Sequence, residues 1–426
     1  MKHYTLRNGV QVVLHPWPTT SATVAIGLRG SGSRNDPRLS SGFVLQGLNH
    51  FAEHVFFRAS RRYPSWQELS RTLDGRASNY NAFTDQSTVV FAIETYSRRI
   101  EALISILADM VRHPLLTLEN IEFERERIRQ EIRVYDDQPE ERVDLDLARR
   151  MLPRTGLDHP ILGTELTLAK IPAAAIRNYH RRQIVGRRLV IAITGGFNVE
   201  RVETAILRQF GRIRPGTTPP HHNLVYHQYP GNIIMSRDDT KQFHLMIGWP
   251  TPGINDPRRI TTGVIRNLLT GRSSARFKQE LDAAGHGYSS EDFYWCYEDL
   301  GQYAIYLPMS YDHIYDAMGL IAKGLWSLKT SLITRDDHDL ALANMSIDAR
   351  GKASEPWNLA IFIARSLINA GTFKPLREYL RDLRSVTRTD IRETANLIFD
   401  PRRMTLIIRG PVQRLRRQRL VELLRY

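Results

Sequence analysis

The stretch GLNHFAEHVF, residues 47–56, contains the pattern H-x-x-E-H at His50, Glu53 and His54. On a helix, positions four apart lie one above the other and a position three along shares their face, so these three side chains converge. Two imidazoles and a carboxylate that converge can hold Zn²⁺ and act on its bound water. The pattern is the inverted form of the H-E-x-x-H metalloprotease motif. These residues alone leave open the alternative of two histidines on an ordinary helix.

A second predicted helix, residues 118–135, has two carboxylates on its apolar face. At 100° per residue, Glu124 and Glu131 fall in one stripe with three isoleucines. A buried carboxylate is costly unless it is paired or binds a metal, and arginine is its ordinary partner. The interpretation we favour makes Glu131 the third zinc ligand and lets Glu124 orient the ligands.

Length and composition define the class of protein. A chain of 426 residues suits two domains of about 200 residues each. The composition is that of an ordinary globular protein, and no apolar run reaches the ~18 to 20 residues that span a bilayer. The start, Met1 to Val10, has neither an apolar signal region nor an amphipathic presequence. A single cysteine, Cys296, fits a reducing compartment, so we expect a cytoplasmic location.

The net charge of +14 is unevenly distributed. Residues 401–426 hold eight arginines against one acid, Glu422. Such a segment can be an anion or nucleic-acid patch or a solvated helix face, and its interspersed leucines favour the solvated face. Because no basic and aromatic stripe accompanies it, we expect no nucleic-acid and no membrane partner, and we assign the charge to an acidic partner subunit or substrate.

The second half of the chain repeats the first. Asn35-Asp36-Pro37-Arg38 recurs as Asn255-Asp256-Pro257-Arg258, which indicates one duplicated architectural unit. The proline-rich stretch 214–223 is then a linker between a zinc-bearing catalytic domain at 1–213 and a homologous domain at 224–426.

Comparison of the two copies shows which residues of the first copy have no counterpart in the second. In this alignment His50 to His54 fall near Gly271 to Ala275, and Glu131 falls on Ser346. The second copy therefore lacks the zinc site. Scaffold histidines would have no reason to appear in only one copy, so the asymmetry favours a zinc site in the first.

Taken together, these residues resemble the pitrilysin/insulinase family of inverted-motif zinc peptidases, in the short two-domain branch that includes the mitochondrial processing peptidase. Residues 47–54 look like the family's G-L-A-H-F-x-E-H, and the interval from His54 to Glu131 matches its H-x-x-E-H-x76-E spacing. Glu124 matches an additional family carboxylate, and residues 81–84 resemble the family's N-A-x-T edge strand. The resemblance covers essentially the whole chain.

The resemblance implies an α+β fold of two homologous domains, each a mostly antiparallel sheet with helices packed on it, which enclose a chamber. It implies a zinc-dependent endopeptidase, a hydrolase with one Zn²⁺ per chain held by His50, His54 and Glu131. Glu53 would activate the zinc-bound water. Backbone groups at Asn81 and Ala82 would bind a peptide or unfolded segment as an added strand.

One departure from the family concerns the cation that completes the site. Tyr288 matches the family's tyrosine, but the position of its arginine holds Asp282 or Leu281. An acid cannot stabilise an oxyanion. We therefore expect a hetero-oligomer in which a zinc-less homologous subunit supplies the arginine and a tyrosine. A homodimer, with Arg276 or another cation substituting, is the alternative.

The alternative function is that of a non-catalytic scaffold subunit of the same fold. The intact set of His50, Glu53, His54 and Glu131 counts against it, because drift would be expected to break at least one of them.

Overall fold

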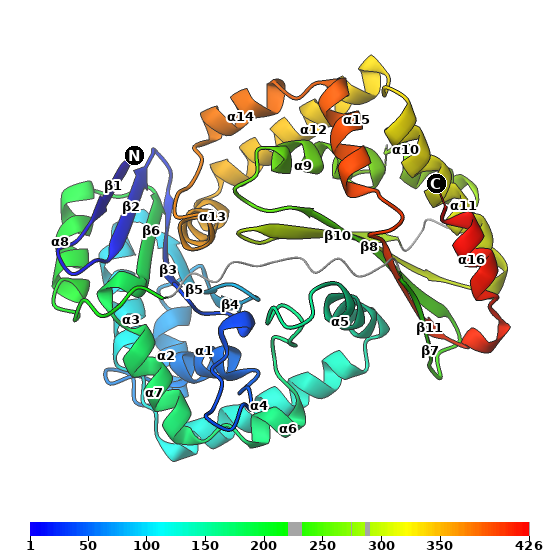
Figure 1. The fold of residues 1–426 in the computed structure, drawn as a ribbon. Coiled ribbons are helices and arrows are strands. Elements are labelled where there is room, and N and C mark those ends of the chain that lie inside the picture. The colour runs from blue at the N-terminus through cyan, green and yellow to red at the C-terminus, as the bar shows by residue number, and fades with distance from the viewer. Residues whose placement is uncertain (220–231, 274, 286–289, 426) are drawn as a thin grey trace. The chain divides into compact units, whose positions relative to one another are not determined.

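The structure is a computed structural model that describes residues 1–219, 232–273, 275–285 and 290–425. The chain forms two compact units, whose elements are labelled in Figure 1. Unit 1 comprises Met1–Val134, His159–His222 and Gly351–Phe373, and unit 2 comprises Tyr135–Asp158, Asn223–Arg350 and Lys374–Tyr426. These units differ from the predicted division at 1–213 and 224–426, because each half of the chain contributes one helical segment to the unit built mainly by the other half.

Unit 1 is a six-stranded sheet in the order β1-β2-β6-β3-β5-β4, in which only the β2–β6 pair is parallel. Its strands are β1 (Lys2–Thr5), β2 (Gln11–Pro16), β3 (Ser21–Leu28), β4 (Asn79–Thr84), β5 (Val89–Tyr96) and β6 (Leu189–Gly195). Its helices are α1 (Leu48–Arg58), α2 (Trp66–Asp74), α3 (Ile100–Arg112), α4 (Leu118–Asp136, which ends in unit 2), α6 (Glu165–Ala169), α7 (Ala173–Gln183), α8 (Val199–Phe210) and α13 (Pro356–Asn369).

Unit 2 repeats this sheet without the first strand, in the order β7-β11-β8-β10-β9, and again only one pair, β7–β11, is parallel. Its strands are β7 (Asn232–Arg237), β8 (Phe243–Pro252), β9 (Glu291–Cys296), β10 (Leu300–Met309) and β11 (Thr405–Gly410). Its helices are α5 (Pro139–Met151), α9 (Arg258–Leu269), α10 (Arg276–Ala283), α11 (Ile314–Thr330), α12 (Arg335–Ser354), α14 (Leu376–Arg384), α15 (Arg388–Ile398) and α16 (Arg417–Leu423). The shared strand order agrees with the predicted duplication, and the predicted α+β class is confirmed.

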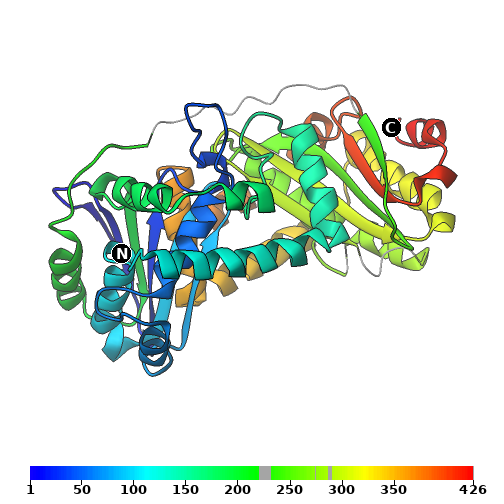
Figure 2. The ribbon, with the colours of Figure 1, turned by 90° about the horizontal axis from the view of Figure 1, so that it is seen from below.

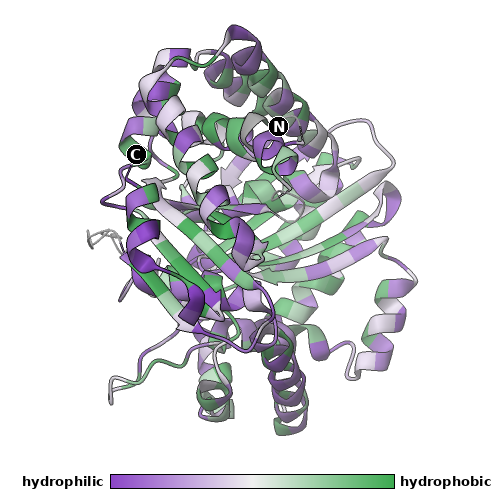
Figure 3. Ribbon diagram, turned by 90° about the vertical axis from the view of Figure 1, so that its right-hand side faces the viewer, coloured by the Kyte–Doolittle hydropathy of each residue, from purple (hydrophilic) through white to green (hydrophobic). Residues whose placement is uncertain are grey.

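Alternation along the strands explains why each sheet is covered on both faces. Successive strand side chains point to opposite faces. In β2, Val12 and Leu14 belong to the cluster under α1 and α3, whereas Val13 belongs to a cluster with α13. In Figure 3, coloured by hydropathy, the strands are mostly hydrophobic and the helices carry hydrophobic and hydrophilic stripes.

The second face of each sheet is covered by the exchanged helix. In unit 1, Ala360, Ile363 and Ala364 of α13 pack on Ala25 and Ala92. In unit 2, Val143 and Leu147 of α5 pack on the corresponding face, beside Met246 and Ile407. The apolar face of a helix does not determine which sheet it covers. The domain boundaries predicted from the sequence therefore missed the exchange of α5 and α13.

The two copies can be matched helix by helix. Thr117 and Thr334 each accept a hydrogen bond from the backbone N–H three residues later, at 3.2 and 3.0 Å, immediately before α4 and α12. With these caps aligned, Glu124 corresponds to Ala341 and Glu131 to Asp348.

The counterpart of α1 is α9, because α1 follows β3 and α9 follows β8, and these two strands occupy the same place in the two strand orders. The predicted alignment of His50 to His54 with Gly271 to Ala275 is therefore wrong, as is that of Glu131 with Ser346. The cause is loop length, since residues 29–47 precede α1 whereas only 253–257 precede α9. The second copy still lacks the H-x-x-E-H residues, because α9, RRITTGVIRNLL, has no histidine or glutamate.

None of the described helices is both long enough and apolar enough to cross a membrane.

Candidate metal centre

The helix α1 presents the H-x-x-E-H residues and begins at a position where only glycine fits. Gly47 has φ +88°, and a Cβ there would lie 2.3 Å from the Leu162 carbonyl oxygen. Ser40 and Ser41, the nearest serines before this helix, are exposed and do not cap it. Instead, the buried Asp36 carboxylate accepts the N–H groups of Gly47 and Asn49 at 2.7 and 3.0 Å. It thereby satisfies N–H groups that a first helical turn leaves without partners.

Three predicted ligands come together. One ligand atom from each of His50, His54 and Glu131 lies within 4.8 Å of the others, and no other such cluster occurs in the described residues. Glu131 Oε2 is 3.8 Å from His50 Nε2 and 3.5 Å from His54 Nε2. Figures 1 and 2 show how this arises, since α4 lies against α1.

These separations fit zinc. Tetrahedral bonds of about 2.0–2.1 Å put neighbouring ligand atoms about 3.3–3.4 Å apart, so Glu131 Oε2 needs to approach the two imidazole nitrogens by only a few tenths of an ångström. Two imidazole nitrogens and one carboxylate oxygen are also a donor set that catalytic zinc uses, with the fourth position left for water.

The two histidines differ in their surroundings. Burial, and secondarily the neighbouring His54, lower the pKa of His50 to about 3, so its imidazole is neutral and has a lone pair to offer. Its Nδ1 makes no hydrogen bond within the described part of the chain. Burial also opposes the charged form of His54, but its hydrogen bond with Glu124 and the charges of Glu53 and Glu131 outweigh it and raise the pKa of His54.

Glu124 is the group that orients His54. Its side chain is almost completely buried, and its Oε2 lies 3.1 Å from His54 Nδ1, which directs Nε2 of that ring toward Glu131. Arg127 Nη1 lies 3.3 Å from the same oxygen, and Arg58 Nε lies 3.9 Å from Oε1. Both interpretations made from the sequence therefore apply at once, because the carboxylate has arginine partners and also holds a ligand.

Glu53 lies beside the cluster without belonging to it. Burial raises the pKa of the Glu53 carboxyl, whereas the charge of His54 and a hydrogen bond from Thr84 oppose that rise. The Thr84 hydroxyl donates to Glu53 Oε2 at 2.8 Å. Thr84 ends strand β4, and its contact with Glu53 was missed although the residue stands in the N-A-x-T motif.

The predicted substrate strand is an edge of its sheet. Strand β4 pairs with β5 on one side, where Asn81 is opposite Ala92 and Ala82 is opposite Phe91. The Asn81 side chain is exposed, and its Oδ1 accepts the backbone N–H of Ala82 at 2.9 Å. Tyr288 lies outside the described residues.

The position where the family carries its arginine holds no cation. Leu281 is buried and Asp282 is exposed near the end of α10.

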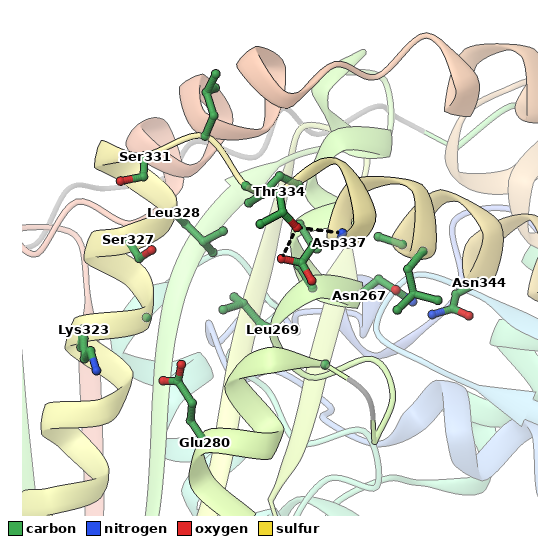
Figure 4. Close-up of a pocket in the computed structure, with 17 residues that line it drawn as sticks. Asn267, Leu269, Glu280, Lys323, Ser327, Leu328, Ser331, Thr334, Asp337 and Asn344 are labelled. Atoms are coloured by element: carbon green, nitrogen blue, oxygen red, sulfur yellow. Dashed lines mark hydrogen bonds between the residues drawn. The ribbon is translucent and has the colours of Figure 1, made fainter.

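The larger of two described cavities, about 360 Å³, lies in unit 2 between α9, α10, α11 and α12. Figure 4 shows that Asp337 reaches back to Thr334, whose hydroxyl lies 2.8 Å from Asp337 Oδ2. Among the described residues, no histidine or cysteine lines the cavity, so these residues offer it no soft metal ligand. Ala341 and Asn344 line it at the positions that Glu124 and Arg127 occupy in unit 1.

Comparisons with known proteins agree with the resemblance. The chain is 25% identical over 401 residues to an uncharacterized zinc protease of Bacillus subtilis, a match that covers 94% of this chain and 96% of the relative. It is 23% identical to the beta subunit of the human mitochondrial-processing peptidase, over 96% of this chain and 84% of the relative. The crystal structure of a protease from Helicobacter pylori shares the fold with a TM-score of 0.87 at 16% identity, over 96% of this chain and 99% of that one.

Two family models match consecutive parts of the chain. The model described as Insulinase (Peptidase family M16) matches residues 12–165, and the model described as Peptidase M16 inactive domain matches residues 170–345. The second description accords with a unit 2 whose described residues hold no metal cluster. The chain therefore belongs to the insulinase family of peptidases, peptidase family M16, and is a metallopeptidase.

Proposed function

We propose that this chain is a zinc-dependent endopeptidase and that unit 1 holds one Zn²⁺ through His50, His54 and Glu131. The observation that carries the proposal is the convergence of these three donors within 4.8 Å, next to a carboxylate that is not one of them. Bound zinc supplies a Lewis acid that lowers the pKa of its water toward ~7 and polarises the scissile carbonyl.

Glu53 is the proton carrier in this proposal. Its carboxylate takes a proton from the attacking water and returns it to the leaving amine. The Thr84 hydroxyl holds Glu53 Oε2 at 2.8 Å and favours the ionised form, which is the form that can accept a proton. Glu124 acts through His54, whose ring it fixes, and not on the substrate.

The substrate class follows from strand β4. Its outer edge has no partner strand in the described sheet, so a peptide or an unfolded segment can add there through main-chain hydrogen bonds. Asn81 and Ala82 contribute backbone groups to this pairing. Because main-chain pairing makes few demands on side chains, the edge defines the register of the substrate more than its sequence.

We further propose that the chain is the catalytic subunit of a hetero-oligomer. One relative is named as the beta subunit of a peptidase, and the position where the family carries an arginine holds Leu281 or Asp282. A zinc-less homologous subunit would supply the arginine and a tyrosine for the oxyanion. Full peptidase activity of the purified chain alone would contradict this and favour a homodimer.

The decisive test of catalysis is Glu53→Gln, which keeps the side-chain size and removes the base. We expect peptide cleavage, measured with the partner subunit present, to fall by roughly 10²- to 10⁴-fold, while zinc content stays at one per chain. Glu126→Gln, on an exposed part of α4, is the matched control and should leave cleavage unchanged. No cleavage by any form would favour the non-catalytic scaffold, and unchanged cleavage in Glu53→Gln would refute the role of Glu53 as the base. The cytoplasmic location stays a prediction, which fractionation of cells tests.

A further inference from the structure

The second described cavity, about 350 Å³, lies in unit 1 where α3 and α7 end. Its lining includes Arg112 and His113 at the end of α3, His180 and Arg181 in the last turn of α7, and Arg214 after α8. No carboxylate of a described residue lines it. It is therefore a cationic cavity made by three segments that are far apart in the sequence.

Hydrogen bonds fix the backbone around this cavity. The N–H of Arg61 donates to the His113 carbonyl oxygen at 2.9 Å. The His180 imidazole Nε2 lies 3.1 Å from the Val111 carbonyl oxygen. The Arg214 guanidinium donates to the Arg181 carbonyl oxygen. The walls are thus held in place independently of any bound group.

The positive charge at this place is not neutralised. Burial, and next the charge of Arg61, lower the pKa of the Arg112 guanidinium, and Asp109 is the carboxylate that opposes them. Asp109 is itself buried and engaged with Arg62, whose N–H it accepts at 2.9 Å. Within the described part of the chain, neither Arg112 nor Arg214 has a carboxylate oxygen within 4.0 Å.

Helix ends account for part of this arrangement. The C-termini of α3 and α7 each carry the equivalent of about half a negative charge, which favours cations in their last turns. Together these two termini offset about one guanidinium, whereas Arg112, Arg181 and Arg214 line the cavity and Arg61 adjoins it. An excess of positive charge remains for a ligand.

We propose that this cavity binds the phosphate group of a small phosphorylated molecule. Guanidinium groups bind phosphate through paired N–H donors, and a phosphate carries up to two negative charges near neutral pH. Ile184 and Ile213 also line the cavity and are 9% and 8% exposed, so they offer an aliphatic surface to the organic part. The volume is within the range of about 300 to 1,000 Å³ that holds small ligands.

Isothermal titration calorimetry tests the proposal on the full chain. Inorganic phosphate should bind, phenyl phosphate should bind more tightly because its ring covers the two isoleucines, and phenol should not bind detectably. Raising the salt concentration should weaken both phosphate ligands. No binding of inorganic phosphate and of phenyl phosphate at roughly 10 mM, where even a millimolar Kd shows, would overturn the proposal. If phenyl phosphate binds with no higher affinity than inorganic phosphate, the proposed contact of the two isoleucines with the organic part of the ligand is wrong.

Variants locate the binding. Arg112→Ala should weaken phenyl phosphate at least about tenfold, and Arg112→Lys should be intermediate, because lysine keeps the charge and loses the planar fork. Arg208→Ala, at an exposed position on α8, is the matched control. Should Arg112→Ala not fold, Arg214→Ala, at an exposed residue, replaces it. Equal affinity in wild type and in the cavity variant, both folded by circular dichroism, would place the ligand elsewhere and refute the assignment.

Discussion

The helix pair α1/α4 of unit 1 and the helix pair α9/α12 of unit 2 occupy the same place in matching sheets, yet among the described residues only the first pair holds a cluster that could bind a metal ion. In unit 1, Glu124 is buried against Arg58, Arg127 and His54. In unit 2, Ala341 stands at the position of Glu124 and lines a cavity of about 360 Å³.

The third ligand position shows the same contrast. Glu131 faces two histidines, whereas its counterpart Asp348 is half exposed and pairs with Arg272. Unit 2 keeps the fold without the buried charges, so folding does not require them. We infer that their retention in unit 1, where burial of charge is costly, serves the metal centre.

The largest effect should come from Glu131→Gln. It removes a charged ligand, so zinc affinity should fall by more than the roughly 10- to 100-fold that loss of an outer partner costs, and cleavage should be lost. Competition with a chromogenic chelator measures the affinity. Asp348→Asn is the matched change in unit 2 and should leave both unchanged. Equal effects of the two substitutions would contradict the assignment of the metal site to unit 1.

Next in size is Glu124→Ala, which gives unit 1 the residue that unit 2 carries at Ala341. His54 loses the group that directs its ring, so zinc affinity should fall about 10- to 100-fold. Glu126→Ala on the exposed face of the same helix serves as control. If the variant shows a cooperative thermal unfolding transition and an unaltered zinc affinity, Glu124 serves only as the ion-pair partner of Arg58 and Arg127.

A smaller effect is expected from Thr84→Val, which removes the hydroxyl that bonds Glu53. Burial already raises the pKa of Glu53 and the Thr84 hydrogen bond opposes this, so its loss raises the pKa further. The acid limb of the rate profile should therefore move to higher pH, with activity recovered at alkaline pH. An acid limb that stays in place would contradict the role of Thr84.

The smallest effect should come from unit 2. Ala341→Leu adds apolar volume to the cavity, and filling such a space typically raises the free energy of unfolding by about 0.5–2 kcal/mol. Thermal unfolding measures the gain. Zinc content and cleavage should not change, and a loss of either would mean that this cavity takes part in the function.

Much of this arrangement could be predicted from residue patterns. The spacing of His50, Glu53 and His54 predicted one helix face, and the stripe of Glu124 and Glu131 predicted a second helix that meets it. Both carboxylates lie where that periodicity indicated, because an α-helix of this length keeps its 3.6-residue repeat without reference to the rest of the chain.

What could not be predicted depends on contacts distant in sequence. Asp36 reaches the start of α1 from a loop, and no local pattern marks it as a cap. The alignment predicted from the sequence did not match α1 with α9, because the loops before these two helices differ in length. The exchange of α5 and α13 was missed because an apolar helix face fits either sheet.

The most direct test of the central claim is the zinc content of the purified chain, measured by elemental analysis after dialysis against trace zinc. We expect one zinc per chain in the wild type and none in His54→Ala. Two zinc ions per chain, or one retained by His54→Ala, would contradict it.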